Sequence, residues 1–115
     1  MEDCIFCKIA QKELSSEVVY ETEDVIAFRD VAPVAPTHIL VIPKKHIASL
    51  THLEENDRLH LLPKIYEAID TLSTDEGLVD DGYRVVANTG KEGGQTVNHL
   101  HFHLLGGRSM QWPPG

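Results

Sequence analysis

The segment at 99–103, His-Leu-His-Phe-His, constrains the fold of this chain more than any other feature. Side chains on a β-strand point alternately to opposite faces, whereas a two-residue step on an α-helix turns by about 200° and would scatter the histidines. The alternation therefore predicts a strand over 97–105. Its three imidazoles share one face, while Leu100, Phe102 and Leu104 point into the core.

Apolar runs and turn residues divide the rest of the chain into short strands and one helical region. Strands are predicted over 18–20, 24–30, 38–42 and 83–88. Apolar residues recur at helical spacing over 54–73, where Pro63 is expected to kink the helix or to start a second one, because proline has no backbone N–H. These elements predict an α+β fold with an antiparallel sheet, in one domain spanning 1–115.

The charge distribution excludes some classes of partner. The net charge of -8 argues against a general nucleic-acid binder, since phosphate backbones require a basic face. No apolar run approaches about 18 residues, so no membrane contact is expected, and acids near the N-terminus argue against a secretory signal. We therefore expect a cytoplasmic protein. From Asn88 to Gly115 the only acid is Glu92, which favours this region for a small anionic ligand.

Three adjacent imidazoles suit chemistry at phosphorus. Imidazole titrates near neutral pH, so one ring can attack while its neighbours donate hydrogen bonds, and crowding lowers their pKa values. The preceding loop, 90–94, ends in Gly93-Gly94, whose N–H groups can approach an anion, and Gln95 and Thr96 add side-chain donors. From the residues alone, a merely polar strand face and a three-histidine zinc site stay open.

These features resemble the histidine triad (HIT) superfamily, whose signature His-φ-His-φ-His-φ-φ (φ, apolar) stands at 99–105. The resemblance is closer to its Hint branch (histidine triad nucleotide-binding proteins, purine nucleoside phosphoramidases). The segments that carry it are Asp30, 35–38, 41–44, 93–95, 105–108 and 112–115. It implies an antiparallel sheet with one main helix and a short N-terminal helix, continued across a homodimer. It also implies hydrolysis of purine nucleoside 5′-monophosphoramidates, such as AMP-NH₂ or AMP-lysine, through a nucleotidyl-histidine intermediate.

Carried over position by position, the resemblance assigns roles to individual residues. His101 matches the nucleophile, His99 and His103 its flanking histidines, and His38 an additional site histidine. Asp30 matches the carboxylate that holds the ribose hydroxyls. The remaining substrate-binding positions are Val31, Asn88, Gly94, Gln95, Thr96 and Trp112, the last reaching the partner subunit's site. Without the resemblance, Asp30 is equally well explained as a turn cap. His38 on an apolar strand is then better explained as a core histidine, and Trp112 as an ordinary packing residue.

The pair Cys4-x₂-Cys7 indicates a metal or redox site in a cytoplasmic chain. No βαβ pattern surrounds it, which disfavours thioredoxin-like redox chemistry, but two buried structural cysteines are about as probable from spacing alone. The cysteine pair together with the Pro-Lys-x-His segment at 43–46 resembles the pattern of HIT proteins that bind zinc. The resemblance therefore implies a structural zinc held by Cys4, Cys7, His46 and His99. His99 then has two candidate roles, of which we prefer the metal.

Two other functions stay open. Hydrolysis of dinucleoside polyphosphates belongs to the same superfamily, but the segments 106–108 and 112–115 argue against it. A non-catalytic nucleotide-binding or scaffold protein is the alternative from a different class, and the intact triad argues against that.

Overall fold

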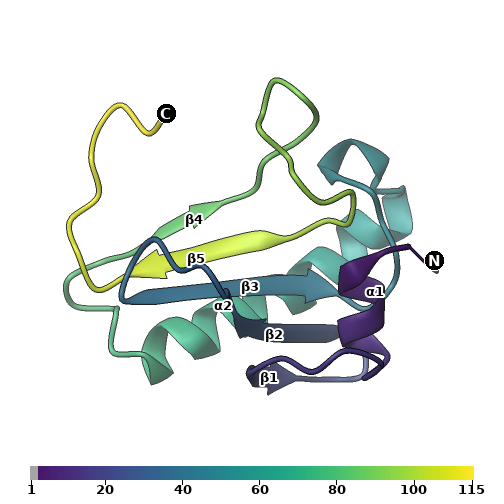
Figure 1. Ribbon diagram of the computed structural model, residues 1–115, viewed down its shortest axis with the longest axis horizontal. Helices are drawn as coiled ribbons and strands as arrows, with labels where there is room; N and C mark the ends of the chain where they lie inside the picture. The colour runs from purple at the N-terminus through teal and green to yellow at the C-terminus, as the bar shows by residue number, and fades with distance from the viewer. Residues whose placement is uncertain (1–2) are drawn as a thin grey trace.

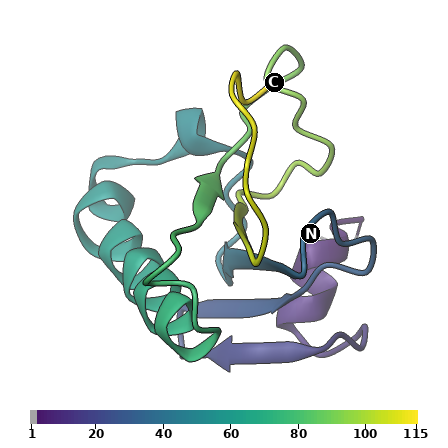
Figure 2. The ribbon, with the colours of Figure 1, turned by 90° about the vertical axis from the view of Figure 1, so that its left-hand side faces the viewer.

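The computed structural model describes residues 3–115 and shows an antiparallel sheet with a helix on each face (Figures 1 and 2). The five strands lie in the order β1-β2-β3-β5-β4, and every neighbouring pair is antiparallel. Their bounds are Val18–Glu21 for β1, Val25–Arg29 for β2, Thr37–Pro43 for β3, Arg84–Val86 for β4 and Phe102–Gly106 for β5. The predicted α+β fold, with one main helix and a short N-terminal helix, is confirmed.

The two faces of the sheet bury separate clusters of apolar side chains. On one face, helix α2 (Leu62–Asp75) packs its buried Ile65, Ala68 and Leu72 against side chains from β2, β3 and β5. On the other face, helix α1 (Ile5–Ala10) packs Phe6 and Ile9 against a smaller cluster from β2 and β3. Figure 2 shows these layers edge-on, with α2 and α1 on opposite sides. Strand β3 is buried along its whole length because it lies at the centre and is covered on both faces.

The helical region consists of two consecutive segments that meet beside Pro63. A π-helical turn, η2 (Asp57–Leu61), precedes α2, and Pro63 lies in the first turn of α2. Proline is tolerated there because a first-turn N–H has no partner within the helix. The helical backbone continues from η2 into α2 without a break, so Pro63 lies at the boundary between two consecutive helical segments and does not start a separate helix. A short 3₁₀ turn, η1 (Leu50–His52), connects β3 to this region.

The predicted strand over 97–105 is wrong in its first half. Strand β5 begins at Phe102, and its pairing with β3 ends where Val41 faces Phe102. Beyond that point the ladder cannot continue, because Pro43 has no N–H and its carbonyl accepts a hydrogen bond from the His99 ring. The Leu100 N–H instead donates to the Ile47 carbonyl at 2.7 Å. The alternation nevertheless persists, since Leu100 and Leu104 enter the α2-side core.

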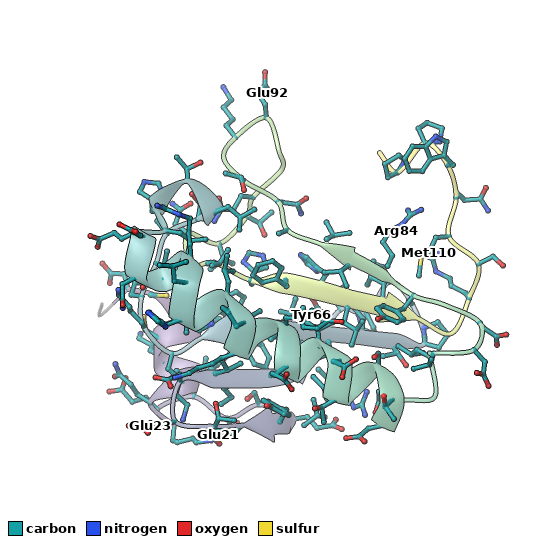
Figure 3. All side chains as sticks on the ribbon, turned by 180° about the vertical axis from the view of Figure 1, so that it is seen from behind. Glu21, Glu23, Tyr66, Arg84, Glu92 and Met110 are labelled. Atoms are coloured by element: carbon teal, nitrogen blue, oxygen red, sulfur yellow. The ribbon has the colours of Figure 1, made fainter. Side chains whose placement is uncertain are left out.

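Two exposed segments leave the body of the fold. The loop after β4 carries Glu92 at its tip, and the C-terminal tail passes beside β4, where Arg84 donates to the Gln111 carbonyl at 2.9 Å (Figure 3). Among residues 3–115, no helix is long and apolar enough to cross a bilayer.

Candidate functional site

A pocket of about 300 Å³ lies on the α1 side of the sheet, at the small end of the usual range for small-molecule sites. Side chains from α1, β2 and β3 make most of its wall apolar. Four of the residues chosen from sequence for polar chemistry line it, namely Asp30, Thr96, His101 and His103. Val31, also predicted, lies at its rim and is almost fully exposed.

The backbone determines which nitrogen of His101 is free. The buried His101 ring has its Nδ1 atom 2.7 Å from the carbonyl oxygen of His99. A carbonyl only accepts hydrogen bonds, so Nδ1 carries the proton and Nε2 keeps its lone pair in the neutral ring. In its neutral form, the His101 ring therefore presents the free Nε2 lone pair from a side chain that lines the pocket, and a nucleophile requires such a lone pair.

His38 and His103 form a second hydrogen-bonded pair. The N–H of Val34 donates to His38 Nδ1 at 3.1 Å, so neutral His38 carries its proton on Nε2. That Nε2 lies 2.9 Å from His103 Nδ1 and 3.4 Å from an oxygen of Asp30. His103 Nδ1 is then the acceptor, and its own proton is on Nε2.

Burial keeps this pair neutral. Desolvation lowers the pKa of His38, only partly offset by the negative charge of Asp30. It also lowers the pKa of His103, and the neighbouring His101 and His38 lower it further. Both rings are therefore uncharged at pH 7.

Four ligand atoms meet in a second cluster, which shares His99 with the triad and which we call the Cys/His cluster: Cys4, Cys7, His46 and His99. All four atoms lie within 4.8 Å of one another. The Sγ atom of Cys4 is 3.2 Å from His99 Nδ1, and that of Cys7 is 3.3 Å from His46 Nδ1 and 3.5 Å from His99 Nδ1. A tetrahedral ion with bonds of about 2.3 Å to sulfur and 2.0–2.1 Å to nitrogen places sulfur and nitrogen about 3.5 Å apart. The cluster thus fits a tetrahedral metal.

The surroundings of His99 support metal binding. Its Nε2 is 2.8 Å from the Pro43 carbonyl, which fixes the proton there and leaves the Nδ1 lone pair facing the two sulfurs. Burial lowers the pKa of His99 and raises the pKa of the Cys7 thiol, so both ligands are neutral until a cation offsets the charge of the thiolates.

Asp30, His38 and His103 also bring three ligand atoms together, but their hydrogen bonds oppose a metal. Since Val34 N–H occupies His38 Nδ1, the Nε2 atom that faces the group bears a proton and offers no lone pair. The separation of 2.9 Å between His38 and His103 is also a hydrogen-bond distance, shorter than the edge of a tetrahedral site. We assign this group to hydrogen bonding.

Two further residues predicted from the sequence, His99 and Gln95, do not line the pocket. His99 is completely buried, with both ring nitrogens engaged, and lies outside the pocket. Gln95 holds the glycine loop: its amide donates to the carbonyls of Ala48 and Val97 and accepts from the Gly90 N–H.

Three other predicted positions, Asn88, Gly94 and Trp112, do not line the pocket of this single chain. Gly94 has a positive φ of 77°, which shapes the turn of the loop. Trp112 is 82% exposed on the tail.

Sequence reasoning missed the apolar wall that α1 contributes. Ile5, Phe6 and Ile9 line the pocket, and the Phe6 ring lies edge-on to His101, with 5.2 Å between ring centroids. The cysteine pair was the sequence signal from which this wall could have been predicted. If Cys4 and Cys7 share a metal with His99, the helix that begins after Cys4 and contains Cys7 must lie beside the triad.

Comparison with known proteins agrees with this arrangement. The chain is 53% identical to an uncharacterized HIT-like protein of Synechococcus elongatus, covering 99% of this chain and 98% of that protein. It is 51% identical to a 14 kDa zinc-binding protein of Zea mays, covering 96% and 87%. Its fold matches that of a HIT family hydrolase from Legionella pneumophila with a TM-score of 0.95 and 51% identity, over 98% and 100% of the two chains.

The triad, the pocket and the Cys/His cluster thus occur in a fold that a solved HIT hydrolase shares almost completely. The family model for the HIT domain matches residues 11–110, which contain all three triad histidines. The chain belongs to the HIT domain family.

Proposed function

We propose that this protein hydrolyses purine nucleoside 5′-monophosphoramidates, such as AMP-NH₂ or AMP-lysine, through a nucleotide bound covalently to His101. The observation that carries the proposal is the hydrogen bond from His101 Nδ1 to the His99 carbonyl. It leaves the Nε2 lone pair on a ring that lines the pocket of about 300 Å³. The same geometry supports a hydrolase of the HIT family in general, and the phosphoramidate is the substrate class that we assign.

In the first step, His101 Nε2 attacks the α-phosphorus, a P–N bond forms to the ring, and the P–N bond to the amine breaks. The leaving amine takes a proton from solvent. In the second step a water molecule attacks phosphorus, the P–N bond to His101 breaks, and the proton of the water returns to solvent, which releases the nucleoside monophosphate and the free imidazole. His103 and Thr96, which line the pocket, are assigned to hydrogen bonding with the phosphoryl oxygens, where negative charge grows.

The pocket supplies distinct surroundings for the other parts of a nucleotide. Its apolar wall, which includes Phe28 and Leu40, suits a purine base. One oxygen of Asp30 is oriented by the Ala32 N–H at 2.8 Å, so the carboxylate is held ready to accept hydrogen bonds from ribose hydroxyls. We assign Asp30 to the ribose on this basis.

Mass spectrometry of protein quenched during turnover of AMP-lysine tests the covalent step. We expect an added AMP on His101 in the wild type, and neither adduct nor turnover in His101→Ala. His60→Ala, at an exposed histidine remote from the pocket, is the matched control and keeps full activity. Turnover that persists in His101→Ala would refute the mechanism. Faster cleavage of a dinucleoside polyphosphate, or AMP binding without any turnover, would favour the two alternative functions.

We also propose that zinc occupies the Cys/His cluster and is structural. The four ligand atoms fit a tetrahedral ion, and one relative bears the name of a zinc-binding protein. When bound, zinc would supply a fixed positive charge that holds both sulfurs as thiolates and ties α1 to the sheet. Metal analysis of the purified protein tests this, and a metal-free protein with unchanged thermal melting would contradict it.

We further propose that two copies form a homodimer through β4. This strand is at the end of the sheet order, and among residues 3–115 no strand pairs with its outer edge. Tyr66 on α2 (Figure 3) is 61% exposed and Val85 on β4 is 42% exposed, so both offer apolar area to an interface. Sedimentation of the wild type and of Val85→Lys tests this, with a dimer expected only for the wild type. A cytoplasmic location remains a prediction from the sequence.

A further inference from the structure

We propose that the cysteine pair is a modification site: peroxide oxidises Cys4, Cys7 then forms a disulfide with it, and α1 loses its attachment to the Cys/His cluster. Because α1 supplies part of the pocket wall, the oxidised protein binds AMP more weakly. The effect on AMP rests on the proposed function, whereas the disulfide and the loosening of α1 are measured without any nucleotide.

The two cysteines differ in their access to solvent. A second cavity, of about 420 Å³, lies beside the Cys/His cluster, and both Cys4 and His46 line it. Cys4 is half-buried, whereas Cys7 is only 4% exposed and lines neither this cavity nor the pocket of the triad. Cysteine oxidation follows the access of the oxidant to sulfur. Cys4 is therefore the sulfur that a small peroxide reaches first.

The two sulfurs are also placed to react with each other. Both belong to the Cys/His cluster, whose ligand atoms all lie within 4.8 Å of one another, and the Cys7 N–H donates to Cys4 Sγ at 3.3 Å. A disulfide bond is about 2.0 Å long, so the side chains must rotate toward each other at the start of α1. Cys-x-x-Cys pairs form such bonds in other proteins. Here the pair is the target of oxidation, not a thioredoxin-like catalyst.

The oxidation takes two steps, with hydrogen peroxide as the oxidant. The Cys4 thiolate attacks one peroxide oxygen, an S–O bond forms, the O–O bond breaks, and hydroxide leaves behind a sulfenic acid. The Cys7 thiolate attacks that sulfur, the S–S bond forms, the S–O bond breaks, and a second hydroxide leaves. The sulfurs lose two electrons, the peroxide oxygens gain them, and both hydroxides take protons from solvent. A disulfide offers no thiolate to a metal, so an ion in the cluster would keep only its two histidines and be released.

Helix α1 depends on these sulfurs for its position. It has only six residues, too few to persist without tertiary contacts. The sulfurs of the Cys/His cluster lie between 3.2 and 3.5 Å from ring nitrogens of its histidines, and this joins the helix to the rest of the fold. After oxidation, only apolar packing holds Phe6 and Ile9 in the pocket wall. We expect AMP to bind about tenfold more weakly, which corresponds to a complete pocket in about one tenth of the molecules.

Mass spectrometry of the zinc-loaded full chain after treatment with hydrogen peroxide tests the modification. We expect a disulfide between Cys4 and Cys7, release of zinc to a coloured chelator, and reversal of the disulfide by dithiothreitol. A wild type that keeps its zinc and both thiols would overturn the proposal.

Cys7→Ser and Cys4→Ser form a matched pair, because each removes one sulfur from the Cys/His cluster. Dimedone, which labels sulfenic acids, should mark Cys4 in the first variant and mark Cys7 far more slowly in the second. Equal labelling in two variants that circular dichroism shows to be folded would refute the order of attack.

Hydrogen exchange and AMP titration test the consequence for α1. The amides of Lys8 and Gln11 donate to the carbonyls of Cys4 and Cys7 at 3.1 and 2.9 Å, and they should lose protection on oxidation while the amides of α2 keep theirs. Calorimetric titration should show the weaker binding of AMP, restored by dithiothreitol. Unchanged protection, or equal AMP affinity in both redox states, would refute the link to the pocket. A reduced chain that fails to bind AMP, while the disulfide and the exchange respond as expected, would contradict the proposed function alone.

Discussion

Replacement of Glu76 by glutamine should weaken the fold in a strongly pH-dependent way. Glu76 follows the last residue of α2 and receives two hydrogen bonds from the Arg29 guanidinium of β2, at 2.9 and 3.0 Å. Its side chain is only 19% exposed, so this ion pair is shielded from solvent more than a surface pair. These bonds, aided by Thr37, hold the pKa of Glu76 below its ordinary value despite partial burial.

The magnitude follows from two opposing effects. Hydrogen bonds to charged partners contribute about 1.5–3 kcal/mol, and the negative end of the α2 dipole offsets about 0.3–1 kcal/mol of this for a carboxylate at that position. We therefore expect Glu76→Gln to lower the free energy of unfolding by about 1–2 kcal/mol at pH 7. In a domain of this size that corresponds to a fall in Tm of about 4–8 °C.

The sign of the pH dependence is fixed by the lowered pKa. Such a carboxylate contributes stability that is fully present above the unfolded pKa of about 4.5 and is lost as pH falls through the folded value. Urea unfolding from pH 3 to pH 7 should show the wild type and variant converging in acid. Glu17→Gln is the control, because Glu17 contacts the same Arg29 but is 73% exposed. A stability difference that stays constant across this pH range would refute the reasoning.

Two further substitutions test the site. His38→Leu leaves the Val34 N–H and one nitrogen of His103 without their hydrogen-bond partner. We therefore expect a lower kcat in steady-state kinetics and a free energy of unfolding lowered by about 1–3 kcal/mol in urea. Full activity in this variant would argue against a functional role for the His38–His103 pair. In Gly93→Ala, the added Cβ would clash with the carbonyl oxygen of Thr89, so the loop must move and KM should rise. Gly115→Ala, where a Cβ meets nothing within 4 Å, should match the wild type, and an unchanged KM for Gly93→Ala would show that the loop does not contact substrate.

The sequence predicted the fold class and the side of the strand that carries the imidazoles, because alternation of side chains is a local property. It did not predict where β5 begins. That boundary depends on Pro43, which is far away in the chain and whose missing N–H and occupied carbonyl end the ladder with β3. Local patterns contain no information about such a partner.

The same limit applies to the chemistry of the site. The residue types of the triad were visible, but their tautomers depend on the Val34 N–H and the His99 carbonyl, which only the folded backbone brings into place. Likewise, Gln95 was expected as a free donor and instead closes its own loop, because its amide lies within reach of the Ala48 carbonyl.

Because the sheet has two differently covered faces, neighbouring residues in the segment 99–103 serve different purposes. Leu100 belongs to the α2-side core, whereas His101, its neighbour in sequence, borders the pocket. Truncation of Leu100 should lower the stability of the fold, whereas truncation of His101 should remove the proposed reacting atom. Substitutions at these two neighbouring positions therefore allow a loss of stability and a loss of turnover to be measured separately.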